Sequence, residues 1–100
     1  MIFIYTTYSN ENEAEKIAKI LLEKKMIACA NIFPIKSLYW WKGKIESSGE
    51  FVLIAKAIED SFNMIKKEVE NIHSYKIPCI IKLRIEPNEK YLCWLLNSLK

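Results

Sequence analysis

His73 and Cys79 are the side chains of this sequence best suited to hold a transition metal. His73 is the only histidine, and Cys79 follows it by six residues. Imidazole nitrogen and thiolate sulfur suit copper and zinc, and one histidine is enough if several copies of the chain, or other groups, complete the site. A histidine at the end of a predicted helix is also stabilised by the helix dipole without any ligand, and Cys79 is equally interpretable as a buried thiol. Both interpretations stay open.

A second set of residues has the chemistry of a binding cleft. A lysine and a carboxylate beside aromatic rings can bind a small anion or metabolite. Glu50 and Lys56 share one face of a predicted strand, but six residues at about 3.3 Å each place them roughly 20 Å apart. Each therefore needs a partner from another strand or chain, which predicts either an inter-subunit ligand cleft or an interfacial ion pair. The set comprises Trp41, Lys44, Glu50, Lys56 and Tyr75.

Several function classes are disfavoured by composition. The net charge is only +3, and fourteen of the fifteen basic residues are lysines interleaved with glutamates, whereas nucleic-acid binders carry clustered basic stripes. The only glycines are Gly43 and Gly49, so no glycine-rich phosphate loop is present. No nucleophile, base and acid form a recognisable set, and we expect no enzyme, although a site between subunits could still use lysine and glutamate for acid–base work.

The cysteines and the hydropathy pattern bear on location. Cys29, Cys79 and Cys93 are an odd number without close spacing, which fits neither a disulfide framework nor a metal knuckle. Cys29 and Cys93 lie in apolar runs and are expected in the core. No uncharged run of about 18 residues could span a bilayer, and the chain begins directly with a strand-like segment instead of a leader. We expect a cytoplasmic protein with no membrane or nucleic-acid partner.

The elements that must position these residues follow from periodicity. Residues 2–7 are β-branched and aromatic and predict a strand. Asn10, with Glu13 three residues later, predicts a capping box at the start of a helix whose apolar positions recur at helical spacing to Leu22. Residues 27–44 predict one long strand bent at 31–34, because a proline in a strand indicates an edge or bulge.

The second half of the chain continues the alternation of predicted strands and helices. Residues 47–49, Ser-Ser-Gly, predict the turn of a hairpin whose second strand spans 50–57. Asp60 or Ser61 is expected to cap a helix that ends near His73. A strand at 79–85 and a closing helix from 86–88 to 99 complete the chain. The order β-α-β-β-α-β plus a helix predicts one α+β domain over residues 1–100, with a ferredoxin-like antiparallel sheet and two helices on one face.

Assembly is expected from the surplus of apolar residues. They make up 51% of the chain, and a domain of this size buries only about 60–65% of the surface of its unfolded chain. The closing helix carries apolar groups around most of its circumference, and the run Leu38–Trp41 directs large side chains to both faces of a strand. A neighbouring copy of the chain is the simplest cover for this surface.

Four sequence strings in order resemble the CutA family of divalent-cation tolerance proteins, and the resemblance covers essentially the whole chain. It implies a homotrimer of ferredoxin-like subunits whose strands join across subunit boundaries, and a role in tolerance of copper or other divalent metals, with copper(II) binding. Because that trimer resembles P-II signalling trimers, a small-molecule sensor, or a structural trimer that organises partner proteins, is the alternative. The strings are Ile27–Asn31 (IACAN), Tyr39–Lys44 (YWWKGK), His73–Pro78 (HSYKIP) and Tyr91–Leu95 (YLCWL).

The sequence also departs from the family pattern. The proposed copper ligands of the family include a cysteine at the end of the first strand and two adjacent histidines. The corresponding positions here are Thr6 and Ile72-His73, so one of the three ligands remains. Ser74 replaces the usual proline, and Cys79 stands where an acidic residue is common. The resemblance therefore implies the family's architecture more strongly than its metal site.

Overall fold

Four antiparallel strands form one sheet in the order β2-β3-β1-β4, and three helices accompany it. The computed structural model describes residues 1–100. The predicted ferredoxin-like arrangement is confirmed, because the elements follow one another as β-α-β-β-α-β with a helix at the end. Their bounds are β1 Ile2–Tyr8, α1 Glu11–Glu23, β2 Cys29–Trp41, β3 Lys44–Ala57, a short 3-10 helix η1 Glu59–Ser61, α2 Phe62–Ile72, β4 Ile80–Arg84 and α3 Glu89–Ser98.

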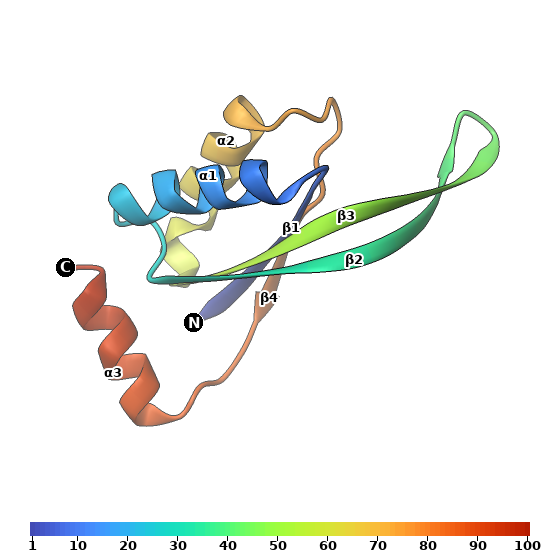
Figure 1. Cartoon of the computed structure of the whole chain (residues 1–100). Coiled ribbons are helices and arrows are strands. Elements are labelled where there is room, and N and C mark those ends of the chain that lie inside the picture. Colours follow the sequence, from blue (N-terminus) through green and yellow to red (C-terminus); the bar gives the residue numbers. More distant parts are fainter.

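The core lies between the sheet and helices α1 and α2, which cover the same face (Figure 1). Successive strand side chains point to opposite faces, so alternate residues of β1 and β3 meet these helices. The apolar stripe of α1 meets them from the other side, as the helical spacing predicts. Thirteen buried residues form this cluster: Ile2, Ile4, Tyr8, Ala14, Ile17, Ala18, Leu21, Ile27, Leu53, Ala55, Ala57, Ile65 and Val69.

The starts of the helices agree only in part with the caps predicted from the sequence. Asn10 caps α1 as predicted, because its Oδ1 accepts the Glu13 backbone N–H at 2.8 Å. The reciprocal half of the predicted capping box is wrong: the Glu13 carboxylate accepts hydrogen bonds from Ser74 instead. Ser61 precedes α2 but makes no side-chain capping bond, because η1 leads directly into that helix.

The turn of the hairpin lies at Lys42–Gly43, not at residues 47–49. Lys42 and Gly43 both have positive φ, at 50° and 78°, and Trp41 pairs with Lys44 across them. Positive φ at both central residues of a two-residue loop is the geometry that matches the twist of a hairpin. The Ser-Ser-Gly segment is instead part of β3, so the predicted long strand through Lys44 is two strands.

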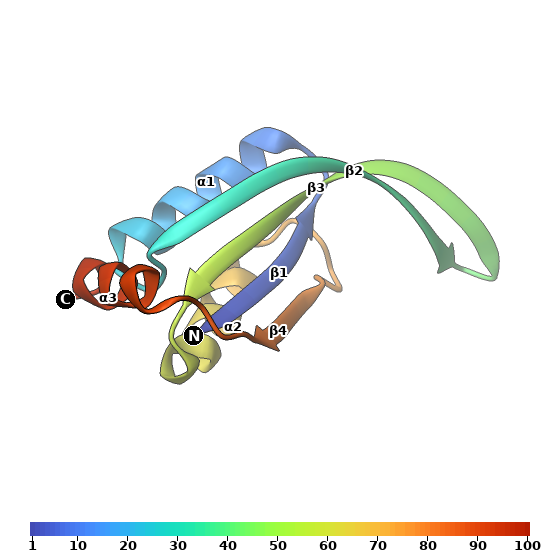
Figure 2. The ribbon, with the colours of Figure 1, turned by 90° about the horizontal axis from the view of Figure 1, so that it is seen from below.

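The distal part of this hairpin projects beyond the sheet. Pairing of β1 with β3 ends at Tyr8 and Phe51, whereas β2 and β3 remain paired for seven more positions. We call residues 35–50 the hairpin arm; Figure 2 shows it curving away from the other two strands. β2 is an edge strand, as its proline predicts, although it runs unbroken through Pro34. The arm accounts for the elongated shape of 45 × 25 × 21 Å.

The edge strand β4 is shorter than predicted and begins at Ile80, so Cys79 lies in the preceding loop. Its polar side chains face the helices: Lys82 lies opposite the core residue Ile4 in the register of the sheet and binds Glu59 of η1 at 2.5 Å. The apolar Ile81 and Leu83 therefore face the other way and are 47% and 49% exposed.

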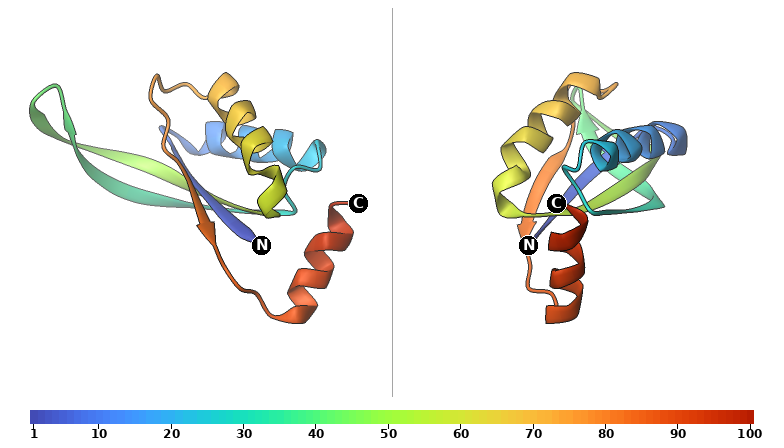
Figure 3. Two further views of the ribbon diagram at one scale, coloured as in Figure 1. Left: turned by 180° about the vertical axis from the view of Figure 1, so that it is seen from behind. Right: turned by 90° about the vertical axis from the view of Figure 1, so that its left-hand side faces the viewer.

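The sheet face opposite α1 and α2 is largely uncovered. We call it the open face; by strand register it includes Tyr5, Ile54 and Phe33 along with Ile81 and Leu83. Only α3 lies on this side, below one end of the sheet (Figure 3). Leu95 of α3 is buried, but Trp94 is 47% exposed. Seventeen of the 100 residues are buried, so much of the apolar surface has no cover within the chain.

Candidate functional site

The loop between α2 and β4, residues 73–79, contains or contacts most of the side chains that could bind a metal ion or a ligand. It leaves the end of α2 at His73, which caps that helix by donating its backbone N–H to the Val69 carbonyl at 2.8 Å. The loop then passes around the end of β1 to reach the edge strand β4 (Figure 1). It therefore meets the start of α1, the end of β1 and the base of the hairpin arm.

His73 is held by hydrogen bonds at both ring nitrogens. Nδ1 accepts the backbone N–H of Tyr75 at 3.0 Å, so the ring hydrogen is on Nε2, which donates to the Thr7 carbonyl at 2.8 Å. The ring also stacks on Tyr8, with centroids 4.6 Å apart and planes 16° from parallel. This imidazole is neutral, and a cation could reach either nitrogen only after one of these bonds is broken.

Tyr75 connects the loop to the hairpin arm. Its hydroxyl donates to the Glu50 carboxylate at 2.6 Å, and its ring lies against His73 with centroids 4.8 Å apart. Desolvation raises the pKa of Tyr75, and the hydrogen bond and charge of Glu50 raise it further. Glu50 thus has a partner within its own chain, and neither Lys44 nor Lys56 forms an ion pair with it.

Cys79 ends the loop as a half-buried free thiol. Burial raises the pKa of the Cys79 thiol, and the negative charge of Glu50 raises it further. Both effects favour the protonated form, whereas a soft metal ligand must be a thiolate. Cys79 is thus electrostatically linked to Glu50 and is a poor donor until it loses its proton.

A carboxylate clamp fixes the loop to the start of α1. The two Glu13 oxygens accept one hydrogen bond each from Ser74, from its backbone N–H at 2.8 Å and its hydroxyl at 2.9 Å. A proline at this position would offer neither donor. The clamp joins residues 61 positions apart in the sequence and anchors Ser74, which lies between His73 and Tyr75 in the chain.

Tyr8 lies beneath this loop with its hydroxyl fully buried and without a hydrogen-bond partner. Burial raises the pKa of Tyr8 to about 12; a nearby Thr6 hydroxyl offsets part of that effect, and the charge of Glu13 adds to it. The Thr6 hydroxyl is itself engaged, donating to the Leu53 carbonyl at 3.4 Å. Tyr8 is therefore a rigid stacking surface for His73 that carries an unsatisfied polar atom.

The structure divides the predicted cleft residues among three places. Glu50 and Tyr75 meet at the loop. Trp41 and Lys44 are cross-strand neighbours at the tip of the hairpin arm, where both are exposed. Lys56 lies at the other end of β3, so a single chain does not assemble the five residues into one cleft.

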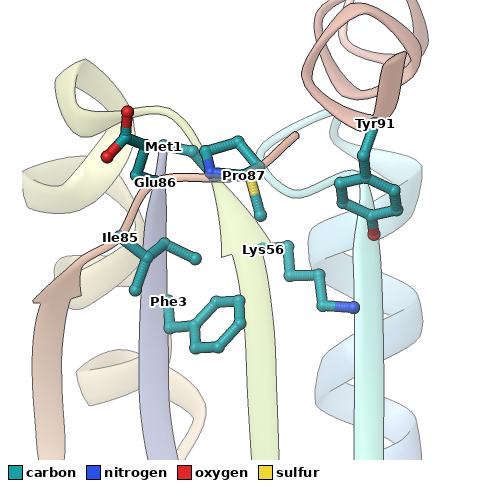
Figure 4. Close-up of a pocket in the computed structure, with 7 residues that line it drawn as sticks. All are labelled: Met1, Phe3, Lys56, Ile85, Glu86, Pro87 and Tyr91. Carbon is teal, nitrogen blue, oxygen red and sulfur yellow. The ribbon is translucent and has the colours of Figure 1, made fainter. Parts of the chain in front are cut away.

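Lys56 lines a shallow cavity of about 370 Å³ between the sheet and α3. Figure 4 shows its ammonium group directed towards the ring of Tyr91, with the ring of Phe3 on the neighbouring strand. The Nζ atom lies 5.2 Å from the Tyr91 centroid and 6.0 Å from that of Phe3, within the range of cation–π attraction. Its nearest carboxylate-bearing neighbour in the cavity wall, Glu86, stands on the opposite rim.

A metal centre is not preformed in the single chain. No group of three or more histidine, cysteine, aspartate or glutamate side chains comes together in a way that could hold an ion. None of the helices is long and apolar enough to cross a membrane.

Comparison with known proteins matches nearly the whole chain to one family. The model of the CutA1 divalent ion tolerance protein family matches residues 2–98. The chain belongs to the CutA1 family. The divalent-cation tolerance protein CutA of Archaeoglobus fulgidus is 51% identical over 94 residues, which cover 93% of this chain and 92% of that protein.

Solved structures agree with this membership. The structure of the periplasmic divalent cation tolerance protein CutA from Archaeoglobus fulgidus has a TM-score of 0.95 at 47% identity, with both chains covered completely. The PII-like protein CutA from Nostoc sp. PCC 7120 in apo form has a TM-score of 0.91 at 24% identity, covering 100% of this chain and 98% of that one. The second likeness concerns the fold alone.

The positions where this CutA1 chain departs from the family pattern have structural roles of their own. Thr6 is buried and bonded to a backbone carbonyl, and Ile72 is an aliphatic side chain at the end of α2. Neither supplies the thiolate or imidazole that the resemblance implies at its position. Ser74, at the usual proline, supplies both donors of the clamp.

Sequence reasoning missed two residues of this site. Glu13 was assigned entirely to a capping box, and Tyr8 was left outside the predicted first strand. The unusual serine between His73 and Tyr75 was the available signal, because its hydroxyl requires a partner that proline does not. The partner itself could not be identified from local sequence.

The clamp predicts a measurable coupling between α1 and the loop. We expect Glu13→Ala to lower the free energy of unfolding by about 1–2 kcal/mol, since it removes two charge-assisted hydrogen bonds on the protein surface. Glu11→Ala is the matched control, because it removes a first-turn charge with no such partner. Urea unfolding at one protomer concentration measures both. Ser74→Ala should add little in the Glu13→Ala background; full additivity would show that the clamp is not a unit.

Tyr8 predicts a loss of stability at alkaline pH. Its pKa of about 12 in the fold exceeds the ordinary value of 10.0, so above pH 10 the unfolded chain releases this proton before the native chain does. The stabilisation is complete below pH 10 and declines between pH 10 and 12. Tyr8→Phe should flatten that decline and, at pH 7, raise stability by about 1 kcal/mol by removing an unsatisfied hydroxyl. Denaturant unfolding across this range tests both effects. A destabilised Tyr8→Phe would indicate that a buried water satisfies the hydroxyl.

Proposed function

We propose that this chain acts as a homotrimer in divalent-cation tolerance and binds copper(II) or another divalent cation weakly through His73 and Cys79. Membership of the CutA1 family and the names of its relatives support the first part. The observation that carries the proposal is the open face, an apolar sheet surface that the chain does not cover itself.

The surfaces available for assembly are large and apolar. On the open face, Ile81, Leu83 and Phe33 are each at least 40% exposed. At the arm, Leu38 is 68% and Trp40 72% exposed. Exposed apolar surfaces of this extent mark protein interfaces. The arm also presents unpaired strand edges, which another chain can extend. Three copies joined through these surfaces would bury both.

The proposed cation contact requires rearrangement of the loop. His73 must give up one ring hydrogen bond, and Cys79 must lose a proton that burial and Glu50 help to retain. The missing ligands at Thr6 and Ile72 leave the remaining coordination to neighbouring chains or water. These requirements favour weak binding that depends on the assembled protein.

A small-molecule sensor is the second candidate function, favoured by the unpaired ammonium of Lys56 in its cavity. We propose binding in preference to catalysis for either function, because both nitrogens of the single histidine are already committed to hydrogen bonds.

We also propose a cytoplasmic location, which the three free cysteines support. The Archaeoglobus fulgidus structure is described as periplasmic.

The assembly should be visible in solution. We expect a particle of about 35 kDa, three times the chain mass of 11.8 kDa, by light scattering at micromolar concentration. Replacing Leu83 of the open face with aspartate should shift the particle towards the monomer, because the charge would be buried without a partner. Asn12→Asp on the exposed side of α1 is the control and should leave the mass unchanged. A stable wild-type monomer would refute the assembly.

Copper(II) binding should depend on both proposed ligands. We expect His73→Ala and Cys79→Ser each to weaken binding about tenfold or more in calorimetric titration, equivalent to about 1.4 kcal/mol. Cys93→Ser is the matched control, since Cys93 lies on α3, outside the loop, and is exposed instead of buried in the core as predicted. Equal affinities in all four proteins would remove His73 and Cys79 from the site. Nanomolar wild-type affinity would mean that further ligands exist.

A further inference from the structure

The cavity at Lys56 is a separate place in the fold from the loop at His73. It lies at the opposite end of β3 from Glu50, about 20 Å away along the strand. Its walls come from the start of β1, the end of β3, the linker before α3 and the first turns of α3 itself. The cation proposal makes no use of it.

The shape of the cavity depends on α3. The linker is tied to the first strand, because the Ile85 backbone N–H donates to the Met1 carbonyl at 3.2 Å. At its far end α3 is held by Lys25, whose Nζ donates to the Ser98 carbonyl at 3.2 Å, and by the fully buried Leu95. The helix is thereby fixed below the end of the sheet and forms one side of a hollow of about 370 Å³. Ligand cavities in proteins begin at about this size.

The chemistry of the lining is asymmetric. Phe3, Met1, Ile85 and Pro87 provide an apolar floor and wall, and Figure 4 shows Lys56 and Tyr91 together on one side with Glu86 on the far rim. Lys56 as a whole residue is half-buried, and its ammonium forms no ion pair. Two aromatic rings attract it only through their faces. A cation without an ionic partner beside apolar walls is well suited to bind an anion.

We propose that this cavity is a binding site for a small organic anion with a flat apolar body, such as an aromatic carboxylate or an aryl phosphate. The anionic group binds Lys56, with the Tyr91 hydroxyl available as a donor, and the apolar body lies on Phe3 and Pro87. The site gives the second candidate function, a small-molecule sensor, a location and a ligand class, and it rests on that candidate and not on cation binding.

The test uses the full-length assembled protein with benzoate and phenyl phosphate as probes and neutral benzyl alcohol as the uncharged comparison. We expect benzoate to bind with a dissociation constant of roughly 1 mM in calorimetry or ligand-detected NMR, as suits a small ligand in an open cavity. Benzyl alcohol should bind at least tenfold more weakly. Lys56→Met should weaken the binding of benzoate at least tenfold, whereas Lys56→Arg should retain this binding. Lys42→Met, at the exposed hairpin turn, is the charge-matched control and should not change it.

A second measurement covers the case in which Lys56→Met does not assemble. Lysines of the wild-type protein are reductively methylated with 13C, and the Lys56 resonance is assigned by its absence in Lys56→Arg. Saturable movement of this resonance with benzoate supports the site. The site would be overturned if the Lys56 resonance did not move, if benzyl alcohol bound as tightly as benzoate, or if Lys56→Met kept the wild-type affinity for benzoate. It would also be overturned if neither probe bound because a neighbouring chain fills the cavity. Copper(II) titration of the same variants should be unaffected, so failure of this site and failure of the cation proposal remain distinguishable.

Discussion

A sheet whose own chain covers only one of its faces is the constraint on which the rest of this structure depends. Helices α1 and α2 pack on alternate residues of β1 and β3 to build the core, and this leaves much of the other face, including Ile81 and Leu83 of β4, without a cover. The remaining helix, α3, reaches only one end of that face. The open face, the exposed indole groups and the cavity beneath α3 are all consequences of this unequal division, since two helices and thirteen core residues cannot enclose an apolar content of 51%.

The loop after α2 shows how a short segment can organise groups from distant parts of the chain. Its residues connect to α1 through Glu13, to β1 through Thr7 and to the hairpin through Glu50. The neutral imidazole of His73 is central to this network, because it accepts at one nitrogen and donates at the other. The same bonds that order the loop occupy both nitrogens, so one of them would have to break before this histidine could coordinate a metal ion.

Local patterns predicted the fold well and the site poorly. The 3.6-residue stripe of α1 and the cap at Asn10 depend on neighbouring residues, and both were correct. The turn at Lys42–Gly43 was misplaced because lysine rarely adopts a positive φ, so Ser-Ser-Gly provided the stronger local signal. The Glu13–Ser74 clamp joins residues 61 positions apart, and no local pattern encodes that distance. The ion pair between Lys82 and Glu59 likewise joins two different elements, β4 and η1.

The hairpin arm has a consequence for how motion is distributed in the molecule. Two strands that share no core with the rest of the fold are held only by their own ladder, and an isolated pair of strands is marginally stable in water. Amide hydrogens of the arm would then exchange with solvent through local opening, at rates set by what lies against the arm and not by global unfolding. In the proposed assembly, protection from exchange along residues 35–50 would therefore increase with protein concentration, while protection of β1 would reflect the chain's own core. One polypeptide thus combines a region ordered by its own core with a region held only by the pairing of its two strands.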